Sequence, residues 1–512
     1  MTTDKNLQFA RTAFVLTCFF SFSTISISGQ NIVDRIDSLM NSYSRNGVFS
    51  GAVLAAKKGN IIYKKAFGLA DNDWNIPNTP DTKFKIASLS KPFTALLVLQ
   101  LAEAGKLNLN ATISDYILDY KGKFGDSITI DQLLTHTSGI ISNLDPAEES
   151  IQEKLYHDLR DMARYSESAD LCFKPGTGFR YSNLAYNILA LIVEKVTGKR
   201  FEEVMKQNIF DRAGLYNTCQ FQNERIESKL AKGYEYKLLT GLQNAAYYDG
   251  SFAVGPGGLI STVEDLFLFD KALYSDILIS EDYITKIFTP YSNGHYGYGW
   301  FVNFRKVNSN GDSILVADHS GSINGFGSYM AHILNDSSFV VILKNQRADT
   351  YIDPAFAPDI GSQIISMLYG GNVALPKKSI ARHIAMRIST GGADSAIAEY
   401  YRIKISDSAN YSMQESELNR LGIELLFKFK MPDEALKIFE LNMKQFPKSY
   451  NTYDSYAYTL REKGDFRNSI VFYRKGLEML KKYPEANDLK TIKKDADQAM
   501  IYISEMEEKI KN

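Results

Sequence analysis

Strand-forming segments stand at both ends of the first 350 residues, and a long helical stretch separates them. Residues 50–68 read as two strands around the turn Lys58-Gly59-Asn60. Strand patterns return later, at 296–303, 313–317, 325–334 and 338–345. This arrangement predicts one antiparallel sheet closed by the two ends of the domain, with an inserted all-helical lobe. We therefore expect an α/β domain with helices flanking the sheet and a cleft between sheet and lobe.

The composition changes after about residue 370, where long amphipathic helices replace the strands. Four residue pairs there are 34 positions apart: Leu426 and Leu460, Ala435 and Ser469, Ile438 and Phe472, and Phe439 and Tyr473. That spacing is the period of the tetratricopeptide (TPR) helical hairpin. We expect a TPR-like, all-α helical-repeat region at 386–512 after a linker at 366–385. An ordinary helical bundle is the alternative, because two units are fewer than the three or so that repeats usually need.

The N-terminus has the layout of an export signal. Basic residues precede an apolar run at 12–22, and Ser26 and Ser28 supply the small residues of a cleavage site. The run is shorter than the roughly 20 residues that span a bilayer, and a retained anchor is the alternative. We expect a signal peptide at 1–28, a first domain at 29–365, and a periplasmic or extracellular protein of a bacterial cell envelope. No integral membrane span would remain after signal removal.

Charge and cysteine content exclude several classes of protein. The chain has 58 basic and 59 acidic residues among 512, so no overall field would attract nucleic acid. Without the signal only Cys172 and Cys219 remain, too few for a disulfide framework. We expect two inert, buried thiols, and one bridge between them is the alternative. No metal-binding or nucleotide-binding motif occurs, so we expect no metal and no cofactor.

Ser88 and Lys91 stand where an apolar helix begins. Pro92 is tolerated only in the first turn of a helix, which places the helix start near Ser88. The hydroxyl would then lie at the helix N-terminus, where developing negative charge is favoured, and Lys91 would share its face. A lysine desolvated in a cleft has a lowered pKa and can activate a serine. The pair is typical of a nucleophile and its base, although S-x-x-K alone also arises by chance.

Two further motifs follow this pair in the chain. Residues 174–183 read KPGTGFRYSN and place Tyr181 and Asn183 at a loop-to-helix junction, and residues 319–321 read HSG. This order of S-x-x-K, Y-x-N and H-x-G, over residues 35–350, resembles the serine β-lactamase and penicillin-binding family. The branch it resembles comprises class C β-lactamases and D-Ala-D-Ala carboxypeptidases, with related esterases and D-aminopeptidases.

The resemblance implies an acyl-enzyme mechanism. Ser88 would attack a carbonyl carbon. Lys91 and Tyr181 would share the general-acid and general-base work, and which of them takes the first proton stays open.

The resemblance also implies a substrate-binding set, formed by Asn183, His319, Gly321 and Ser322. Asn183 would orient Lys91 and the substrate amide. The backbone amides of Ser88 and Ser322 would form the oxyanion hole, with Gly321 on the same strand. His319 would contact the carboxylate or the acyl side of the substrate.

Each of these residues also has a structural interpretation. Tyr181 alone would be a core aromatic, Asn183 a helix N-cap and His319 a loop histidine. Their joint order favours the functional interpretation. Residues 291–297 repeat both later motifs within one glycine-rich turn, where we do not expect the site. We expect His136, in LLTHTSG, to be structural.

The sequence therefore predicts an exported serine hydrolase that acts on a small acyl, peptide or ester substrate. Weak or no β-lactamase activity is expected, because His319 stands where many relatives carry lysine and neutral imidazole binds a carboxylate less firmly. The alternative is a non-catalytic ligand-binding or scaffold protein that uses the cleft. In either case the helical repeats would offer a surface for a protein partner.

Overall fold

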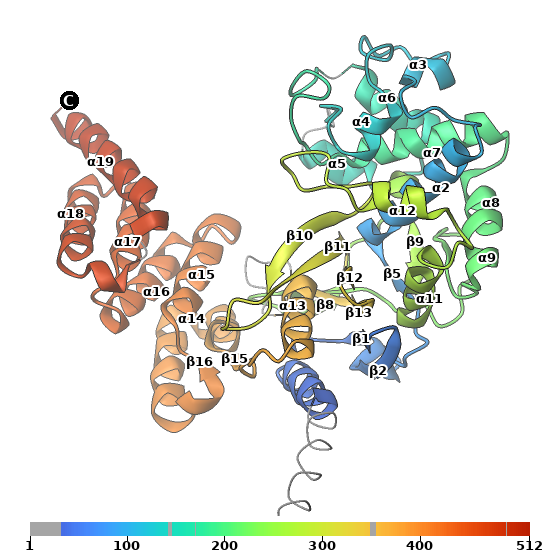
Figure 1. Ribbon diagram of the computed structural model, residues 1–512. Helices are drawn as coiled ribbons and strands as arrows, with labels where there is room; N and C mark the ends of the chain where they lie inside the picture. Colours follow the sequence, from blue (N-terminus) through green and yellow to red (C-terminus); the bar gives the residue numbers. More distant parts are fainter. Residues whose placement is uncertain (1–31, 142–145, 169, 349–354, 488, 512) are drawn as a thin grey trace, which may run out of the picture. The chain divides into compact units, whose positions relative to one another are not determined.

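A computed structural model of the protein describes residues 32–141, 146–168, 170–348, 355–487 and 489–511 (Figure 1). The signal peptide expected at 1–28 lies outside these residues. The chain divides into two compact units. The larger contains the residues up to Tyr234, Asn244–Arg347 and Ala355–Leu375, and the smaller contains Glu235–Gln243 and the residues from Pro376 onward.

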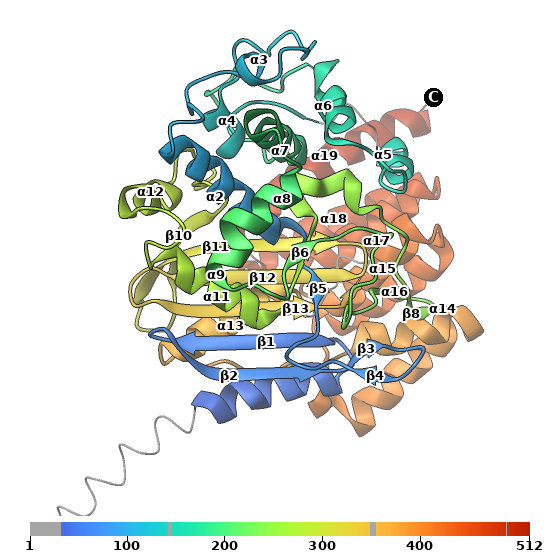
Figure 2. The same ribbon diagram turned by 90° about the vertical axis from the view of Figure 1, so that its right-hand side faces the viewer.

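A six-stranded antiparallel sheet forms the centre of the larger unit. Its strands are β1 (Gly51–Lys57), β2 (Asn60–Phe67), β10 (Phe301–Lys306), β11 (Ser313–Ile323), β12 (Phe326–Ile333) and β13 (Ser338–Lys344). They lie in the order β10-β11-β12-β13-β1-β2, which Figure 2 shows face on. Gly51 pairs with Lys344, so the first and last strands of the domain are joined. This confirms the predicted α/β fold with a sheet closed by its two ends.

Both faces of this sheet are buried. Successive side chains of a strand point to opposite faces, and each face packs against its own hydrophobic core. In β1, Leu54 faces one hydrophobic cluster and Val53 faces the other. The helix at residues 32–45 and α13 (Ala357–Leu368) cover the face of Val53. The helices α2 (Ser90–Glu103) and α11 (Val263–Leu273) cover the face of Leu54. The site therefore lies in a domain of three layers, helix on sheet on helix.

The helical lobe is inserted between β2 and β10. Its helices are α3 (Ile113–Tyr116), α4 (Ile130–Leu134), α5 (Pro146–Gln152), α6 (Leu159–Glu167), α7 (Asn183–Thr197) and α8 (Phe201–Met205). The capping box of Thr129 and Gln132 begins α4 as predicted. Helix α7 begins after its N-cap Ser182 and ends at Gly198, which has φ 67°. Both boundaries follow from local sequence signals.

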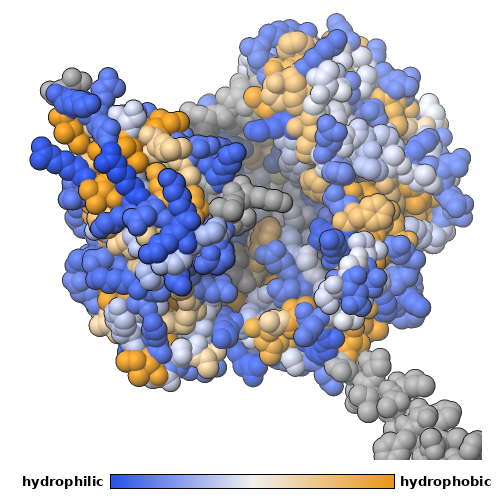
Figure 3. Space-filling view, turned by 60° about the vertical axis from the view of Figure 1, so that its left-hand side comes forward, coloured by the Kyte–Doolittle hydropathy of each residue, from blue (hydrophilic) through white to orange (hydrophobic). Residues whose placement is uncertain are grey.

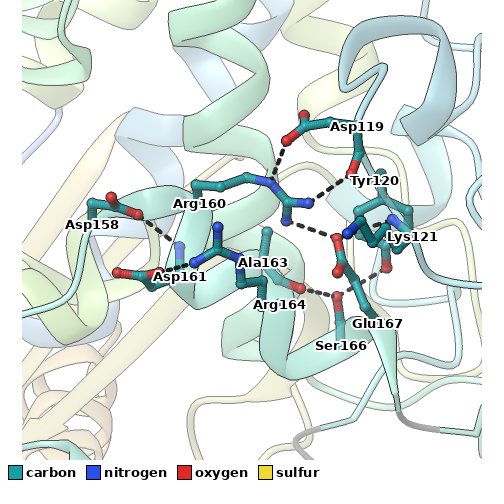
Figure 4. Close-up of polar contacts among 10 residues, drawn as sticks. All are labelled: Asp119, Tyr120, Lys121, Asp158, Arg160, Asp161, Ala163, Arg164, Ser166 and Glu167. Atoms are coloured by element: carbon teal, nitrogen blue, oxygen red, sulfur yellow. Dashed lines mark hydrogen bonds and ion pairs between the residues drawn. The ribbon is translucent and has the colours of Figure 1, made fainter.

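Arg160 fastens α6 to the rest of the lobe (Figure 4). Its guanidinium donates to the side chain of Asp119 at 3.0 Å and to the Asp119 carbonyl at 2.7 Å, and it pairs with Glu167 at 2.7 Å. Tyr120 and Ser166 add a hydroxyl pair at 2.9 Å. These contacts join α6 to the segment at residues 119–120.

Two sequence expectations differ from the structure. The strand expected at 296–303 begins only at Phe301, because the residues before it turn: Gly299 has φ 85°. The two thiols are free, but they are not buried as expected: Cys172 is exposed and Cys219 is half-buried. The Cys172 thiol donates instead to the Gly139 carbonyl, at 3.2 Å.

The smaller unit is mostly helical from α14 onward, and one short strand, β16 (Tyr411–Ser412), pairs with β15 (Lys378–Ser379). Its helices are α14 (Ile380–Ser406), α15 (Glu415–Ile423), α16 (Pro432–Gln445), α17 (Tyr450–Glu462), α18 (Phe466–Lys482) and α19 (Leu489–Lys511). The backbone of α14 is broken at Gly391 and Gly392, so α14 consists of two helices joined by a kink. Consecutive helices from α15 to α19 pack against one another. The starts of α16 and α18 are 34 positions apart. Because α13 ends at Leu368 and α14 begins at Ile380, the connection is shorter than the expected linker at 366–385.

The surface of the helical unit is mixed in character. Hydrophilic side chains cover much of the face shown in Figure 3, and apolar side chains form separate patches between them. The exposed apolar residues of this unit include Ile405, Val471, Met500 and Ile501. Among the helices that the structure describes, none has both the length and the apolar character needed to cross a bilayer.

Candidate active site

Ser88 lies in a tight turn that leads from a strand into α2. The strand β5 (Phe84–Lys85) pairs with β9 (Leu259–Ser261), and the turn Ala87–Leu89 follows as one 3-10 helix. Ala87 has φ 49°, a left-handed conformation that is costly for a residue with a side chain. The turn leaves Ser88 half-buried at the start of α2. Pro92 lies in the first turn of that helix, as the sequence predicts.

Lys91 is fully buried beside Ser88 and has no acidic partner in the described part of the chain. Its Nζ lies 3.1 Å from Ser88 Oγ, 2.9 Å from Asn183 Oδ1 and 3.0 Å from the Pro256 carbonyl oxygen. Burial lowers the pKa of Lys91 well below its ordinary value. A neutral amine is therefore accessible within hydrogen-bonding distance of the serine hydroxyl. Asn183, the first residue of α7, reaches Lys91 as predicted.

Tyr181 stands over Lys91 from the segment that precedes α7. The Lys91 Nζ lies 4.7 Å from the centre of its ring. Burial raises the pKa of Tyr181, and a hydrogen bond with Ser88 acts in the opposite direction. The phenol is therefore protonated at ordinary pH. The structure thus brings together Ser88 and Lys91 from one part of the chain with Tyr181 and Asn183 from another.

Gly321 allows β11 to lie directly against the serine turn. A Cβ at this position would lie 2.4 Å from the Ile86 carbonyl oxygen and 3.0 Å from the Ser88 nitrogen. Ser328 on the neighbouring strand donates to the same Ile86 carbonyl at 2.7 Å. The next residue on β11, Ser322, is exposed. Gly321 on β11 therefore lies directly against the turn that carries Ser88.

His319 corrects one expectation from the sequence. It is only 2% exposed, and both of its ring nitrogens have protein partners. Nδ1 lies 2.7 Å from the Ser320 carbonyl, which can only accept, so Nδ1 carries the proton. Nε2 lies 3.1 Å from the Tyr296 hydroxyl and accepts from it. The imidazole thus has no free nitrogen for a substrate carboxylate, and burial with the nearby Lys91 lowers the pKa of His319 to about 3.

Sequence reasoning missed two groups that complete the site. Tyr296 lies in the glycine-rich turn that the motif comparison set aside, and its ring is buried at 4.6 Å from that of His136. The Pro256 carbonyl belongs to the short helix α10 (Val254–Gly257). Tyrosine spacing alone cannot reveal such a long-range contact. The nearest local signal is the glycine pair Gly257-Gly258 that directly follows Pro256 in the sequence.

A cavity of about 330 Å³ opens beside Tyr181 and Asn183. Its lining is mixed: apolar and aromatic side chains such as Ile141, Met162, Leu184 and Phe252 alternate with the polar residues Ser182, Asn183 and Asn187. Glu149 and Arg180 add one charge of each sign.

Comparison with known proteins agrees with this geometry. The family model described as Beta-lactamase matches residues 32–355. Penicillin-binding protein 4* of Bacillus subtilis is 30% identical over 352 residues, which cover 64% of this chain and 74% of that protein.

Solved structures show the same fold. A penicillin-binding protein from Bacillus halodurans is 30% identical with a TM-score of 0.53, covering 60% of this chain and 94% of that one. A D-amino acid amidase from Ochrobactrum anthropi SV3 is 19% identical with a TM-score of 0.55, covering 68% of this chain and 99% of that one, and is alike in fold alone. Since the family model matches more than half of the chain, the protein belongs to the Beta-lactamase family of serine hydrolases.

Proposed function

We propose that the protein is an exported serine acyl hydrolase that forms an acyl-enzyme on Ser88. One observation carries the proposal: a fully buried lysine amine lies 3.1 Å from Ser88 Oγ and has no acidic partner among the described residues. A serine hydroxyl becomes a nucleophile when such a base takes its proton. The family match supports the same chemistry.

The two flanking groups divide the proton transfers. Lys91 is the better base, because burial favours its neutral amine, whereas burial keeps the Tyr181 phenol protonated. As Ser88 Oγ bonds to the carbonyl carbon, its proton passes to Lys91. The bond to the leaving group then breaks, and Tyr181 gives that group a proton, which Lys91 replaces. Water releases the acyl group by the reverse transfers.

The amides of Ser88 and Ser322 would hold the oxyanion that forms in each step. Gly321 supports this role because it lets β11 approach the serine turn closely. Preorganised backbone donors of this kind stabilise a tetrahedral intermediate without reorganisation.

We infer that the leaving group of the substrate carries no carboxylate. Both nitrogens of His319 are engaged within the protein, so the H-x-G motif offers no cation to such a group. Simple esters and amides of small acyl groups are therefore favoured over D-Ala-D-Ala peptides and β-lactams. The fold that the chain shares with a D-amino acid amidase is compatible with amide substrates.

Export and the helical unit are part of the proposal. The layout of residues 1–28 supports a signal peptide and an envelope location. The 34-residue spacing of α16 and α18 supports a TPR-like repeat that recruits a protein partner.

Labelling with a fluorescent fluorophosphonate tests the proposed function. The wild-type protein should be labelled, and Ser88→Ala should not. Ser90→Ala is a matched control, because the Ser90 hydroxyl bonds to the backbone: it donates to the Ala87 carbonyl at 2.8 Å and accepts from the Leu259 N–H at 3.1 Å. A folded wild type that gives no adduct with this probe or with penicillin would instead support a ligand-binding protein. Nitrophenyl esters, amino-acid amides and D-Ala-D-Ala peptides then rank the substrates.

A further inference from the structure

His136 holds the backbone on both sides of Tyr181. It lies in the loop that follows α4 and is completely buried. Its carbonyl oxygen accepts from the Arg180 N–H at 2.9 Å, and its Nδ1 accepts from the Ser182 N–H at 3.1 Å. One residue therefore fixes the two amides that flank the phenol of the candidate site.

The His136 ring also supports the Tyr181 ring directly. The two ring centres are 4.4 Å apart and the planes are tilted by 39°. On its other sides the imidazole contacts Tyr296 at 4.6 Å and Tyr186 at 5.1 Å. Because Tyr186 in turn donates to the Leu134 carbonyl at 2.9 Å, the ring is enclosed and cannot turn freely. The position of Tyr181 thus depends on backbone bonds and on ring packing from the same residue.

The protonation of His136 follows from these contacts. A backbone N–H can only donate, so Nδ1 must be the unprotonated nitrogen and Nε2 carries the proton. Burial, with the nearby Lys91 and His319, lowers the pKa of His136 well below its ordinary value, so the ring stays neutral. The acceptor that holds Ser182 is therefore present in the favoured, neutral form of the ring.

This arrangement is costly in two ways. His136 has φ 58°, the left-handed region that most residues avoid. Its Nε2–H is buried and finds no hydrogen-bond partner among the residues that the structure describes. Positions that keep both kinds of strain are concentrated at functional sites, where the surrounding structure enforces them.

We propose that His136 is a positioning residue for the reaction, acting through Tyr181 and without touching the substrate. It keeps the phenol at the distance from Ser88 and Lys91 at which a proton can pass. This inference rests on the proposed function, since it assigns His136 a part in that same proton transfer. Displacing a catalytic group by about 1 Å can cost roughly 100-fold in rate.

Three substitutions at this position separate positioning from folding. Asparagine is enriched in the left-handed region, and its side-chain oxygen can replace Nδ1 as the acceptor, so His136→Asn should keep kcat within about fivefold. His136→Leu removes the acceptor and should lower kcat by roughly 30- to 100-fold with KM changed by less than about threefold. His136→Gly removes the acceptor and the ring without left-handed strain, so it replaces the leucine variant if that protein does not fold.

The readout is kcat on a nitrophenyl ester, normalised to the fraction of Ser88 that a fluorophosphonate titrates. The matched control is His332→Asn. His332 is another buried histidine, and its Nδ1 lies 2.8 Å from an Asp270 carboxylate oxygen rather than beside Tyr181. It should lower the melting temperature and leave the normalised kcat unchanged.

Each outcome bears on one of the two proposals. A wild-type kcat in both His136→Leu and His136→Gly overturns the positioning role, although Ser88 labelling by the wild type would still support the proposed function. Equal loss in His136→Asn and His136→Leu also overturns it, because the acceptor would then be irrelevant. A wild-type protein that is never labelled overturns the proposed function, and this inference with it.

Discussion

Replacing Gly321 with alanine should disable the oxyanion hole while leaving the fold intact. The new Cβ would lie 2.4 Å from the Ile86 carbonyl oxygen, whereas ordinary contact begins near 3.4 Å. The strand β11 and the serine turn would therefore have to separate by roughly 1 Å. A hydrogen bond of about 2.9 Å is lost over such a shift. Losing one oxyanion donor costs about 3 kcal/mol of transition-state stabilisation, or roughly 100- to 1,000-fold in kcat.

The assay is kcat on a nitrophenyl ester, per Ser88 titrated, together with the melting temperature. Gly327→Ala is the matched control, because Gly327 lies on the neighbouring strand opposite Ser322 and the nearest atom to its new Cβ is 3.9 Å away. This variant should behave as the wild type. A Gly321→Ala protein that folds and keeps kcat within about threefold of the wild type would refute the oxyanion-hole assignment.

Two predictions concern pH. Because burial lowers the pKa of Lys91, the rate of Ser88 labelling should fall with acidification only below that lowered pKa. A labelling rate that still rises near pH 10.5, the ordinary lysine pKa, would contradict the role of Lys91 as the base. The pKa of His319 is lowered to about 3, so between about pH 6.5 and 3 the unfolded chain binds a proton that the folded chain does not. The free energy of unfolding should therefore fall with acidification by up to about 1.4 kcal/mol per pH unit. In urea titrations at several pH values, His319→Gln should reduce this slope. Equal slopes in the two proteins would argue against a neutral buried imidazole.

Local signals in the sequence were sufficient for much of the fold. Positive φ at Lys58 and Gly59 makes the first hairpin turn, and this requirement is visible in the residue types. Pro92 placed the start of α2 to within two residues. The pairing of β1 with β13 followed because two apolar strand groups at the ends of one domain must bury each other.

The residues of the candidate site that lie in short sequence motifs could be predicted. The contacts between residues far apart in the chain could not. The helical spacing of Ser88 and Lys91 already implied their contact, which the structure has at 3.1 Å. The partners of His319 could not be foreseen, because Tyr296 reaches it only through a turn at Gly299 that interrupts an expected strand. Nor could burial of Cys172 be judged, since exposure of a loop depends on what packs over it.

The closure of the sheet has a consequence for how the chain acquires its structure. Ser50 and Asn345, which are hydrogen-bonded at 2.8 Å, are 295 positions apart. Strand β1 of the first hairpin therefore cannot pair with β13 until almost the whole domain has emerged from the ribosome. Such late, long-range pairing is slow, and it keeps the nascent polypeptide open for an extended time. A chain that must be threaded through a membrane pore before it collapses would benefit from that delay.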